Sequence, residues 1–274
     1  MFERYFPREM LDEFSKFDSI QEIRVRADCA VLVTDSQKTH VTQHKTSCEL
    51  VQKIFTSVCS NSVYALKEQI KQGFITIPGG HRVGICGRCV CDKGEIETIT
   101  DISSLNFRVA REVLNCAAPI LKKVNNMAEN IVIISPPNSG KTTYLRDLCR
   151  LYALRGFMVA IVDERGELAP QVKGKSVFSF GKGVDVLQYA PKAQGMMLAL
   201  RTMNPHIVAT DEIGSDGEGH AVAEIAKCGV RIIATFHGAN LDDFKRRFEM
   251  WHVFKYAVLL NREKKPEAFI CLNG

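Results

Sequence analysis

The sequence has 274 residues, of which 46% are hydrophobic and 24% charged, with a formal net charge of +5. This length and composition predict a globular chain of one or two domains, and no apolar run is long enough to span a bilayer. The first residues carry acids and lack an extended apolar segment, which argues against a secretory signal and predicts a cytoplasmic protein. The charge is too mild to identify a partner, because acidic lipid, nucleic acid and no partner at all are each compatible with it.

Residues 1–114 predict a smaller N-terminal domain of mixed α and β structure. Apolar residues at helical spacing predict helices over residues 2–17, 48–60 and 63–71. A strand is expected over residues 20–27, where apolar and polar residues alternate. An antiparallel meander is expected over 74–110, because two Gly-containing turns separate its apolar runs.

Arginine is frequent on the predicted strands of this domain. The arginines are Arg24, Arg26, Arg82, Arg88, Arg108 and Arg111. A guanidinium group matches the charge and geometry of a phosphate, so one of them could act as an arginine finger on a nucleotide held by a neighbouring subunit. The alternative is that these residues solvate the sheet or pair with Asp and Glu.

Ten cysteines are scattered along the chain. In a chain of this length without a secretory signal they predict reduced thiols rather than a disulfide framework. Cys86, Cys89 and Cys91 lie close together, but no second pair follows at zinc-finger spacing. A metal cluster is therefore the weaker interpretation of these three residues.

Residues 115–129 predict a connecting helix, and a nucleotide-binding domain is expected over 130–274. It opens with an apolar strand at 130–134, a loop rich in Pro and Gly, and a helix. The loop amides and the helix N-terminus point their N–H groups at one position, where they can bind a phosphate. Lys141 adds a full positive charge there, and Thr142 can ligate Mg²⁺. The expected triphosphate site consists of Ser135, Pro136, Pro137, Asn138, Ser139, Gly140, Lys141, Thr142 and Thr143.

The phosphate loop differs from the usual P-loop pattern at Ser135, where that pattern has glycine. A second Gly-Lys-Ser at 174–176 also fits a relaxed form of the pattern. No apolar strand leads into this second copy, and the residues after it do not make a helix. The sequence therefore favours the first site.

An acidic cluster, residues 163–167, follows the apolar strand predicted over 157–162. Open α/β sheets bind their ligands at the carboxyl ends of strands, so Glu164 or Glu167 could orient water or Mg²⁺. Ion pairing with Arg165 is the alternative interpretation of this cluster.

A second acidic pair, Asp211 and Glu212, ends the strand predicted over 206–210. Asp211 is expected to hold the Mg²⁺ shell, and Glu212 is expected to polarise the water that attacks the γ-phosphate. The next strand ends on Thr235 and His237, where a sensor of the γ-phosphate would lie. A P-loop followed by two carboxylates at a strand end is a more specific indication of a nucleotide-hydrolysing site than either motif alone.

The remaining elements complete an alternation of strands and helices, which predicts a parallel sheet. Helices are expected over 141–155, 191–203, 218–228 and 241–249, and a closing hairpin over 256–260 and 268–272.

This order of motifs resembles the secretion ATPases that drive pili and type II secretion. Their Walker A loop, acidic box, Walker B strand and histidine box correspond here to residues 135–142, 163–167, 211–212 and His237. The chain is more similar still to the stage III sporulation protein AA family. The similar segments are Ser62–Leu66, Gly79–Gly84, Val162–Glu167, Pro191–Met196 and Asp211–Gly214.

The resemblance implies an α/β fold, with a RecA-like P-loop NTPase domain preceded by the smaller α+β domain. It implies a cytosolic ATP- and Mg²⁺-dependent motor with Glu212, Glu164, Glu167 and His237 as catalytic candidates and Thr142 and Asp211 as metal ligands. It also implies a homo-hexameric ring on the mother-cell side of a membrane, acting with integral membrane proteins of a sporulation channel.

Two other functions are compatible with the same motifs. A nucleic-acid-dependent RecA-like ATPase is favoured by the basic balance and the arginine-rich strands, although no RNA- or DNA-binding module of recognised sequence is present. Stimulation of hydrolysis by single-stranded DNA or RNA would identify it. The second alternative is a nucleotide-gated scaffold that binds nucleotide without hydrolysing it, and Ser135 in the phosphate loop favours this alternative. Turnover by the assembled oligomer would exclude it.

Overall fold

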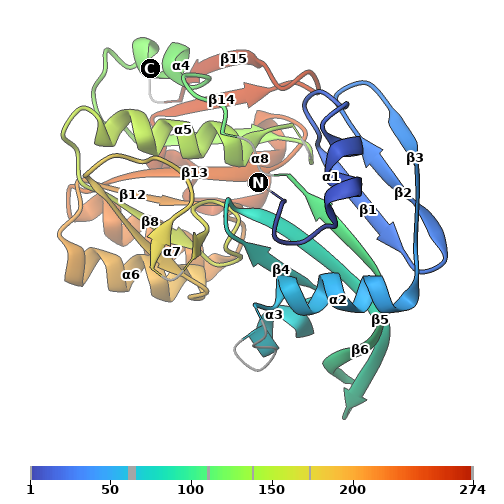
Figure 1. Cartoon of the computed structure of the whole chain (residues 1–274). Helices are drawn as coiled ribbons and strands as arrows, with labels where there is room; N and C mark the ends of the chain where they lie inside the picture. The colour runs from blue at the N-terminus through green and yellow to red at the C-terminus, as the bar shows by residue number, and fades with distance from the viewer. Residues whose placement is uncertain (1, 61–65, 110–111, 138, 173, 273–274) are drawn as a thin grey trace. The chain divides into compact units, whose positions relative to one another are not determined.

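The computed structural model describes residues 2–60, 66–109, 112–137, 139–172 and 174–272 (Figure 1). The chain divides into two compact units, Met1–Arg111 and Glu112–Gly274. Within the described ranges, no helix is both long enough and apolar enough to cross a membrane.

Unit 1 is built on a six-stranded antiparallel sheet with the order β3-β2-β1-β6-β5-β4. The strands are β1 (Glu22–Arg26), β2 (Cys29–Thr34), β3 (Thr39–Thr46), β4 (Phe74–Ile77), β5 (His81–Asp92) and β6 (Glu95–Arg108). The predicted meander is confirmed as β4, β5 and β6. Strands β2 and β3 were not predicted. In β3 only Thr42 and Thr46 are buried, so the sequence of this strand shows no apolar alternation.

Three helices pack on one face of this sheet: α1 (Arg8–Phe14), α2 (Cys48–Val58) and α3 (Lys67–Lys71). The first helix is shorter than predicted, because Pro7 lacks an amide proton and stands just before its first turn. Helix α2 is capped by the Ser47 side chain, which accepts a hydrogen bond of 3.2 Å from the Leu50 amide. Of the signature at 62–66, only Leu66 lies within the described residues.

Four arginines of unit 1, Arg24, Arg26, Arg82 and Arg108, lie on the face opposite this core. Ile23 and Val25 are buried, so the alternating Arg24 and Arg26 point to the other face, and Arg82 pairs across the sheet with Arg108. Arg24 forms an ion pair of 2.6 Å with Glu22.

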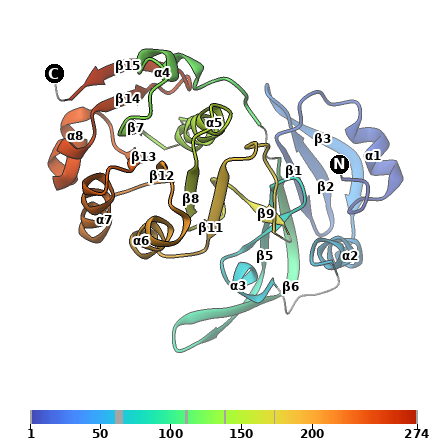
Figure 2. The same ribbon diagram turned by 90° about the vertical axis from the view of Figure 1, so that its left-hand side faces the viewer.

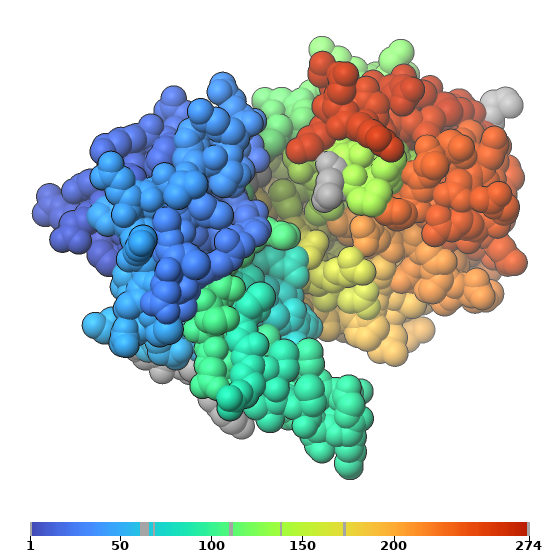
Figure 3. Space-filling view, turned by 90° about the vertical axis from the view of Figure 1, so that its right-hand side faces the viewer, coloured from blue at the N-terminus to red at the C-terminus, as the bar shows by residue number. Residues whose placement is uncertain are grey.

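The other arginines of this set have different surroundings. The Arg82 guanidinium lies 3.5 Å from the centroid of the Phe74 ring, and Arg88 is 3.4 Å from Asp101. Arg26 and Arg108 are exposed, and Arg111 lies outside the described residues. The ribbon made by the distal parts of β5 and β6 projects beyond the pairing with β1 and β4 (Figure 3).

Unit 2 is built on a seven-stranded sheet with the order β11-β8-β12-β13-β7-β14-β15. The strands are β7 (Ile131–Ser135), β8 (Val159–Asp163), β11 (Val184–Gln188), β12 (Ile207–Thr210), β13 (Arg231–His237), β14 (Tyr256–Leu260) and β15 (Pro266–Cys271). All neighbouring pairs are parallel except β14 with β15. The predicted parallel sheet and closing hairpin are confirmed, whereas β11 was not predicted.

Helices cover both faces of this sheet (Figure 2). Helices α4 (Ala118–Lys123) and α5 (Lys141–Ala153) lie on one face; α6 (Lys192–Met203), α7 (Asp216–Lys227) and α8 (Leu241–Arg247) lie on the other. A short 3₁₀ helix, η2 (Glu249–Val253), leads into β14. Strands β7, β8 and β12 are buried along their whole length, which explains their continuous apolar sequences.

Candidate functional site

The polar residues of interest lie where four neighbouring strands of unit 2 end. Strands β8, β12, β13 and β7 are adjacent and parallel, so their carboxyl ends share one edge of the sheet. Asp163 ends β8, Asp211 follows β12, His237 ends β13 and Ser135 ends β7. In open α/β folds this edge is the usual place for a ligand.

The loop after β7 leads into the N-terminus of α5, a helix of 13 residues. Gly140 caps this helix with φ of +86°, a conformation that an L-residue with a Cβ adopts only at a cost. The first turn of α5 contains no acidic residue, so its unpaired amides and helix dipole favour an anion. Asn138 lies outside the described residues.

Lys141 is buried at the base of this loop, with 5% of its surface exposed. Its ammonium donates hydrogen bonds of 3.3 Å to the carbonyl oxygens of Ser135 and Pro136. Burial lowers the pKa of Lys141, while the charges of Glu212 and Asp211 oppose that shift. An ammonium group held in this way is well placed to neutralise a phosphate.

The hydroxyl of Thr142 and the carboxylate of Asp211 are in direct contact. Thr142 Oγ1 donates a hydrogen bond of 2.6 Å to Asp211 Oδ2. Thr235 Oγ1 donates to Asp211 Oδ1, on the other side of the same carboxylate. Residues from α5, from β13 and from the position just after β12 therefore meet at one carboxylate group.

Glu212 is held by three groups. Its amide donates a hydrogen bond of 2.8 Å to Thr235 Oγ1, and its carbonyl oxygen accepts one of 2.6 Å from Lys192 Nζ. Its carboxylate lies 2.9 Å from Arg165 Nη1. The backbone of Glu212 is left-handed, with φ of +51°, which is uncommon for a residue other than Gly, Asn or Asp.

The acidic segment after β8 is organised by Asp163. This residue is buried, and its carboxylate accepts hydrogen bonds of 3.0 Å from the Glu167 amide and 2.8 Å from the Ala169 amide. Burial raises the pKa of Asp163, although these amides oppose the shift. Glu164 is exposed and lies 3.7 Å from Lys192, and Glu167 is exposed.

The structure thus brings together some of the expected site residues and separates others. A small cavity is lined by Asp163, Glu164, Arg165, Glu167, Lys192, Asp211 and Glu212. Arg165 pairs with Glu212 and not with its acidic neighbours in sequence. The His237 side chain is exposed at the end of β13, and its carbonyl oxygen accepts a hydrogen bond from Arg247.

The expected loop residues differ in exposure. Ser135 and Ser139 are buried, and their hydroxyls donate to the carbonyl oxygens of Pro136 and Pro137. Thr143 is half-buried.

The second Gly-Lys-Ser does not open a helix: Lys175–Ser176 is the short strand β10, which pairs with β9 (Gln171–Val172).

Two basic residues of the site were not expected from the sequence. Arg146 donates hydrogen bonds of 2.7 Å to the carbonyl oxygens of Leu168 and Glu167, and its guanidinium lies 3.9 Å from the centroid of the Phe178 ring. Burial lowers the pKa of Arg146. Lys192 is the other residue. In the sequence it belonged to the family-like segment Pro191–Met196, but no role was predicted for it.

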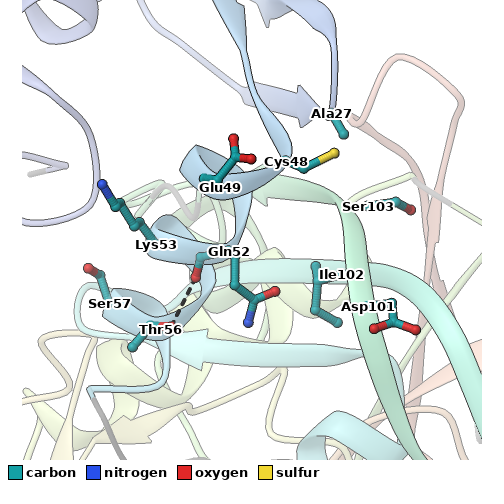
Figure 4. A pocket seen from close by; sticks show the side chains of 10 residues that line it. All are labelled: Ala27, Cys48, Glu49, Gln52, Lys53, Thr56, Ser57, Asp101, Ile102 and Ser103. Atoms are coloured by element: carbon teal, nitrogen blue, oxygen red, sulfur yellow. Dashed lines mark hydrogen bonds between the residues drawn. The ribbon is translucent and has the colours of Figure 1, made fainter.

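A groove of about 890 Å³ in unit 1 has a different character (Figure 4). It lies between one face of α2 and the β6 segment Asp101–Ser103, and it is lined by α2 residues four positions apart, such as Cys48 and Gln52. The charged side chains in this lining are the basic Lys53 and the acidic Glu49 and Asp101. They do not form an arrangement comparable to the strand-end site of unit 2.

The residues at the strand ends fit a magnesium-bound triphosphate. Hydroxyl and carboxylate oxygens are suitable Mg²⁺ ligands, and Thr142 and Asp211 present both in contact. Lys141, the loop amides and the α5 N-terminus would face the phosphates. When bound, the metal would neutralise phosphate charge.

Comparison with known proteins agrees with this fold. The profile of the family described as "Sporulation stage III, protein AA" matches residues 5–272. The stage III sporulation protein AA of Bacillus subtilis (strain 168) is 36% identical over 259 residues, covering 90% of this chain and 84% of that protein.

Two solved ATPase structures share the fold. The ATPase DotB of Yersinia pseudotuberculosis has 16% identity and a TM-score of 0.61, covering 94% of this chain and 76% of DotB. The pilus retraction motor PilT, solved with bound ADP, has 13% identity and a TM-score of 0.62, covering 92% of this chain and 76% of PilT. The predicted α/β fold with a RecA-like P-loop domain is confirmed.

Proposed function

The chain belongs to the stage III sporulation protein AA family, and we propose that it is a Mg²⁺-dependent ATPase with its active site at the strand ends of unit 2. The observation that carries this proposal is the contact between Thr142 of α5 and Asp211 after β12. It joins the phosphate loop to the acidic strand end, as one metal-bound triphosphate requires.

Each residue has a defined part in the proposed reaction. Lys141 binds the β- and γ-phosphates, while Thr142 and Asp211 hold the metal. Glu212 orients and polarises the attacking water; the new bond forms between water oxygen and the γ-phosphorus, and the bond to the β-phosphate oxygen breaks. Glu164, Glu167 and His237 are candidates for ordering water and sensing the γ-phosphate.

We further propose that the ATPase works as a motor in a ring of identical subunits, six in number by analogy with secretion ATPases. It would lie in the cytoplasm on the mother-cell side of a membrane and energise a channel built from integral membrane proteins. The shared fold with a pilus retraction motor supports this analogy, as does the arginine-bearing face of unit 1.

Two substitutions test the proposed site. Lys141→Ala should abolish nucleotide binding, because it removes the charge that faces the phosphates. Glu212→Gln should bind ATP with nearly unchanged affinity but hardly turn over, because an amide cannot polarise water. Binding is measured by calorimetry and turnover by phosphate release from the assembled oligomer. Unchanged hydrolysis in both variants would refute the site.

The same assays separate the other functions. Strong stimulation by single-stranded DNA or RNA would identify a nucleic-acid-dependent ATPase. Nucleotide binding by the wild-type oligomer with no turnover would indicate a nucleotide-gated scaffold.

A further inference from the structure

Lys192 is a lysine with a largely buried side chain in an unfavourable position. It is the first residue of α6, and its side chain is only 11% exposed. A cation at a helix N-terminus is disfavoured by the helix dipole, and removing an ammonium group from water is costly. Local helix formation therefore does not explain this residue.

The ammonium of Lys192 contacts three segments of the site. It donates a hydrogen bond of 2.6 Å to the carbonyl oxygen of Glu212, after β12. It lies 3.2 Å from Glu218 Oε1 in the first turn of α7, and 3.7 Å from Glu164 Oε2 after β8. One side chain thus connects the ends of two strands and the start of a helix.

Lys192 also completes the restraint on Glu212. The left-handed backbone of Glu212 persists only if its surroundings hold it. Thr235 Oγ1 accepts from the Glu212 amide, and Lys192 donates to the Glu212 carbonyl oxygen. Side chains therefore bind both polar groups of this residue's backbone.

We propose that Lys192 is a positioning residue for Glu212, an inference that rests on the proposed ATPase function. By holding the carbonyl oxygen, it keeps the backbone of Glu212 in the conformation that aims the carboxylate at the attacking water. The competing explanation is structural: Lys192 would only neutralise Glu218, which is buried and accepts hydrogen bonds from the amides of Gly214 and Ser215.

Two variants separate these explanations. Lys192→Met removes the ammonium but leaves the Glu218 carboxylate buried and without its cation. In the double variant Lys192→Met/Glu218→Gln the buried charge is removed as well, while the glutamine oxygen can still accept from the Gly214 amide. If Lys192 positions Glu212, kcat should fall on the order of 100-fold in both variants, with the ATP affinity changed by less than about 2-fold.

The double variant is decisive because a structural role predicts a different result. If Lys192 only neutralised Glu218, the double variant would recover wild-type kcat together with thermal stability, and the proposal would be overturned. Lys192→Arg, which keeps a donor, should retain more activity than Lys192→Met. Lys227→Met is the control, because Lys227 is an exposed lysine of α7 that pairs with Glu224, and it should leave kcat unchanged.

A crystal structure of the double variant tests the inference independently of turnover. We expect the φ angle of Glu212 to leave the left-handed region. If Glu212 keeps its conformation and its pairing with Arg165, Lys192 does not position it, whether or not the wild type hydrolyses ATP. Absence of ATP hydrolysis by the wild-type oligomer would instead contradict the proposed function.

Discussion

Thr142 and Asp211 are 69 positions apart in the sequence, and their side chains form a hydrogen bond of 2.6 Å. The contact forms because α5 begins at the end of β7 while Asp211 follows β12, and only β13 separates these two strands. The proposed phosphate-binding loop and the carboxylate proposed to hold the metal are thereby placed side by side.

We predict that Thr142→Val weakens ATP binding about 10-fold when Mg²⁺ is present and has little effect when Mg²⁺ is chelated. The substitution keeps the shape of the side chain but removes one oxygen ligand; about 1.4 kcal/mol corresponds to a tenfold change in affinity. Calorimetric titration with ATP, with and without Mg²⁺, measures both values.

A double-mutant cycle tests whether the two residues act together. Asp211→Asn combined with Thr142→Val should weaken Mg²⁺-dependent binding less than the sum of the single effects, because the two residues share one ligand. Thr202→Val is the control, since its hydroxyl donates only to the Leu198 carbonyl oxygen of its own helix. Strict additivity would show that the contact plays no part in metal binding.

We also predict that ATP affinity begins to fall at a lower pH than it would if Lys141 had the ordinary pKa of lysine. Burial lowers the pKa of Lys141 in the free protein, and a bound polyanion raises it again. Between these two pKa values, binding must take up a proton, so affinity decreases as the pH rises through that window. The dissociation constant measured between about pH 7 and pH 10 shows this.

A control separates Lys141 from general effects of alkaline pH. Lys182→Ala removes an exposed lysine and should give the same pH profile as the wild type. Proton uptake is detected directly when the heat of binding depends on the ionisation enthalpy of the buffer. A dissociation constant that is flat across this range would mean that Lys141 keeps its proton throughout.

The main elements of unit 2 could be predicted because their signals are local. The run Ile131–Ile134 is apolar, the loop contains Pro and Gly, and Leu145 and Leu148 continue with helical spacing. The strand ends then converge by the geometry of a parallel sheet, which any alternation of strands and helices implies. Such reasoning predicts where the site lies.

The contacts within the site depend on tertiary structure and could not be predicted. That Arg165 pairs with Glu212, 47 positions away, follows from the neighbouring positions of β8 and β12. The role of Thr235 as acceptor for the Glu212 amide follows from the register of β12 and β13. Strand β11 was missed because it is an edge strand with no fully buried residue.

The arginines of unit 1 lead to a last prediction, which concerns Arg108. Arg24 and Arg88 have carboxylate partners. Arg108 is exposed and lies opposite Arg82 on β5 and opposite Glu22 on β1, and the carboxylate of Glu22 pairs with Arg24. Because the Glu22 carboxylate pairs with Arg24, we infer that the exposed Arg108 guanidinium serves a partner outside its own subunit, and the phosphates of a neighbouring nucleotide are suitable. Arg108→Ala should lower turnover at least about 10-fold without changing ATP affinity.

Mixing subunits tests whether Arg108 acts across the subunit boundary. Arg108→Ala and Glu212→Gln subunits, each with reduced turnover alone, should release phosphate faster when assembled together, because some interfaces then combine an intact Arg108 with an intact Glu212. Arg88→Ala is the matched control, since its guanidinium faces Asp101 on the neighbouring strand, and it should turn over like the wild type. If the mixture is no more active than the variants alone while both assemble normally, Arg108 does not act in trans. If Arg108→Ala alone has full activity, it takes no part in hydrolysis.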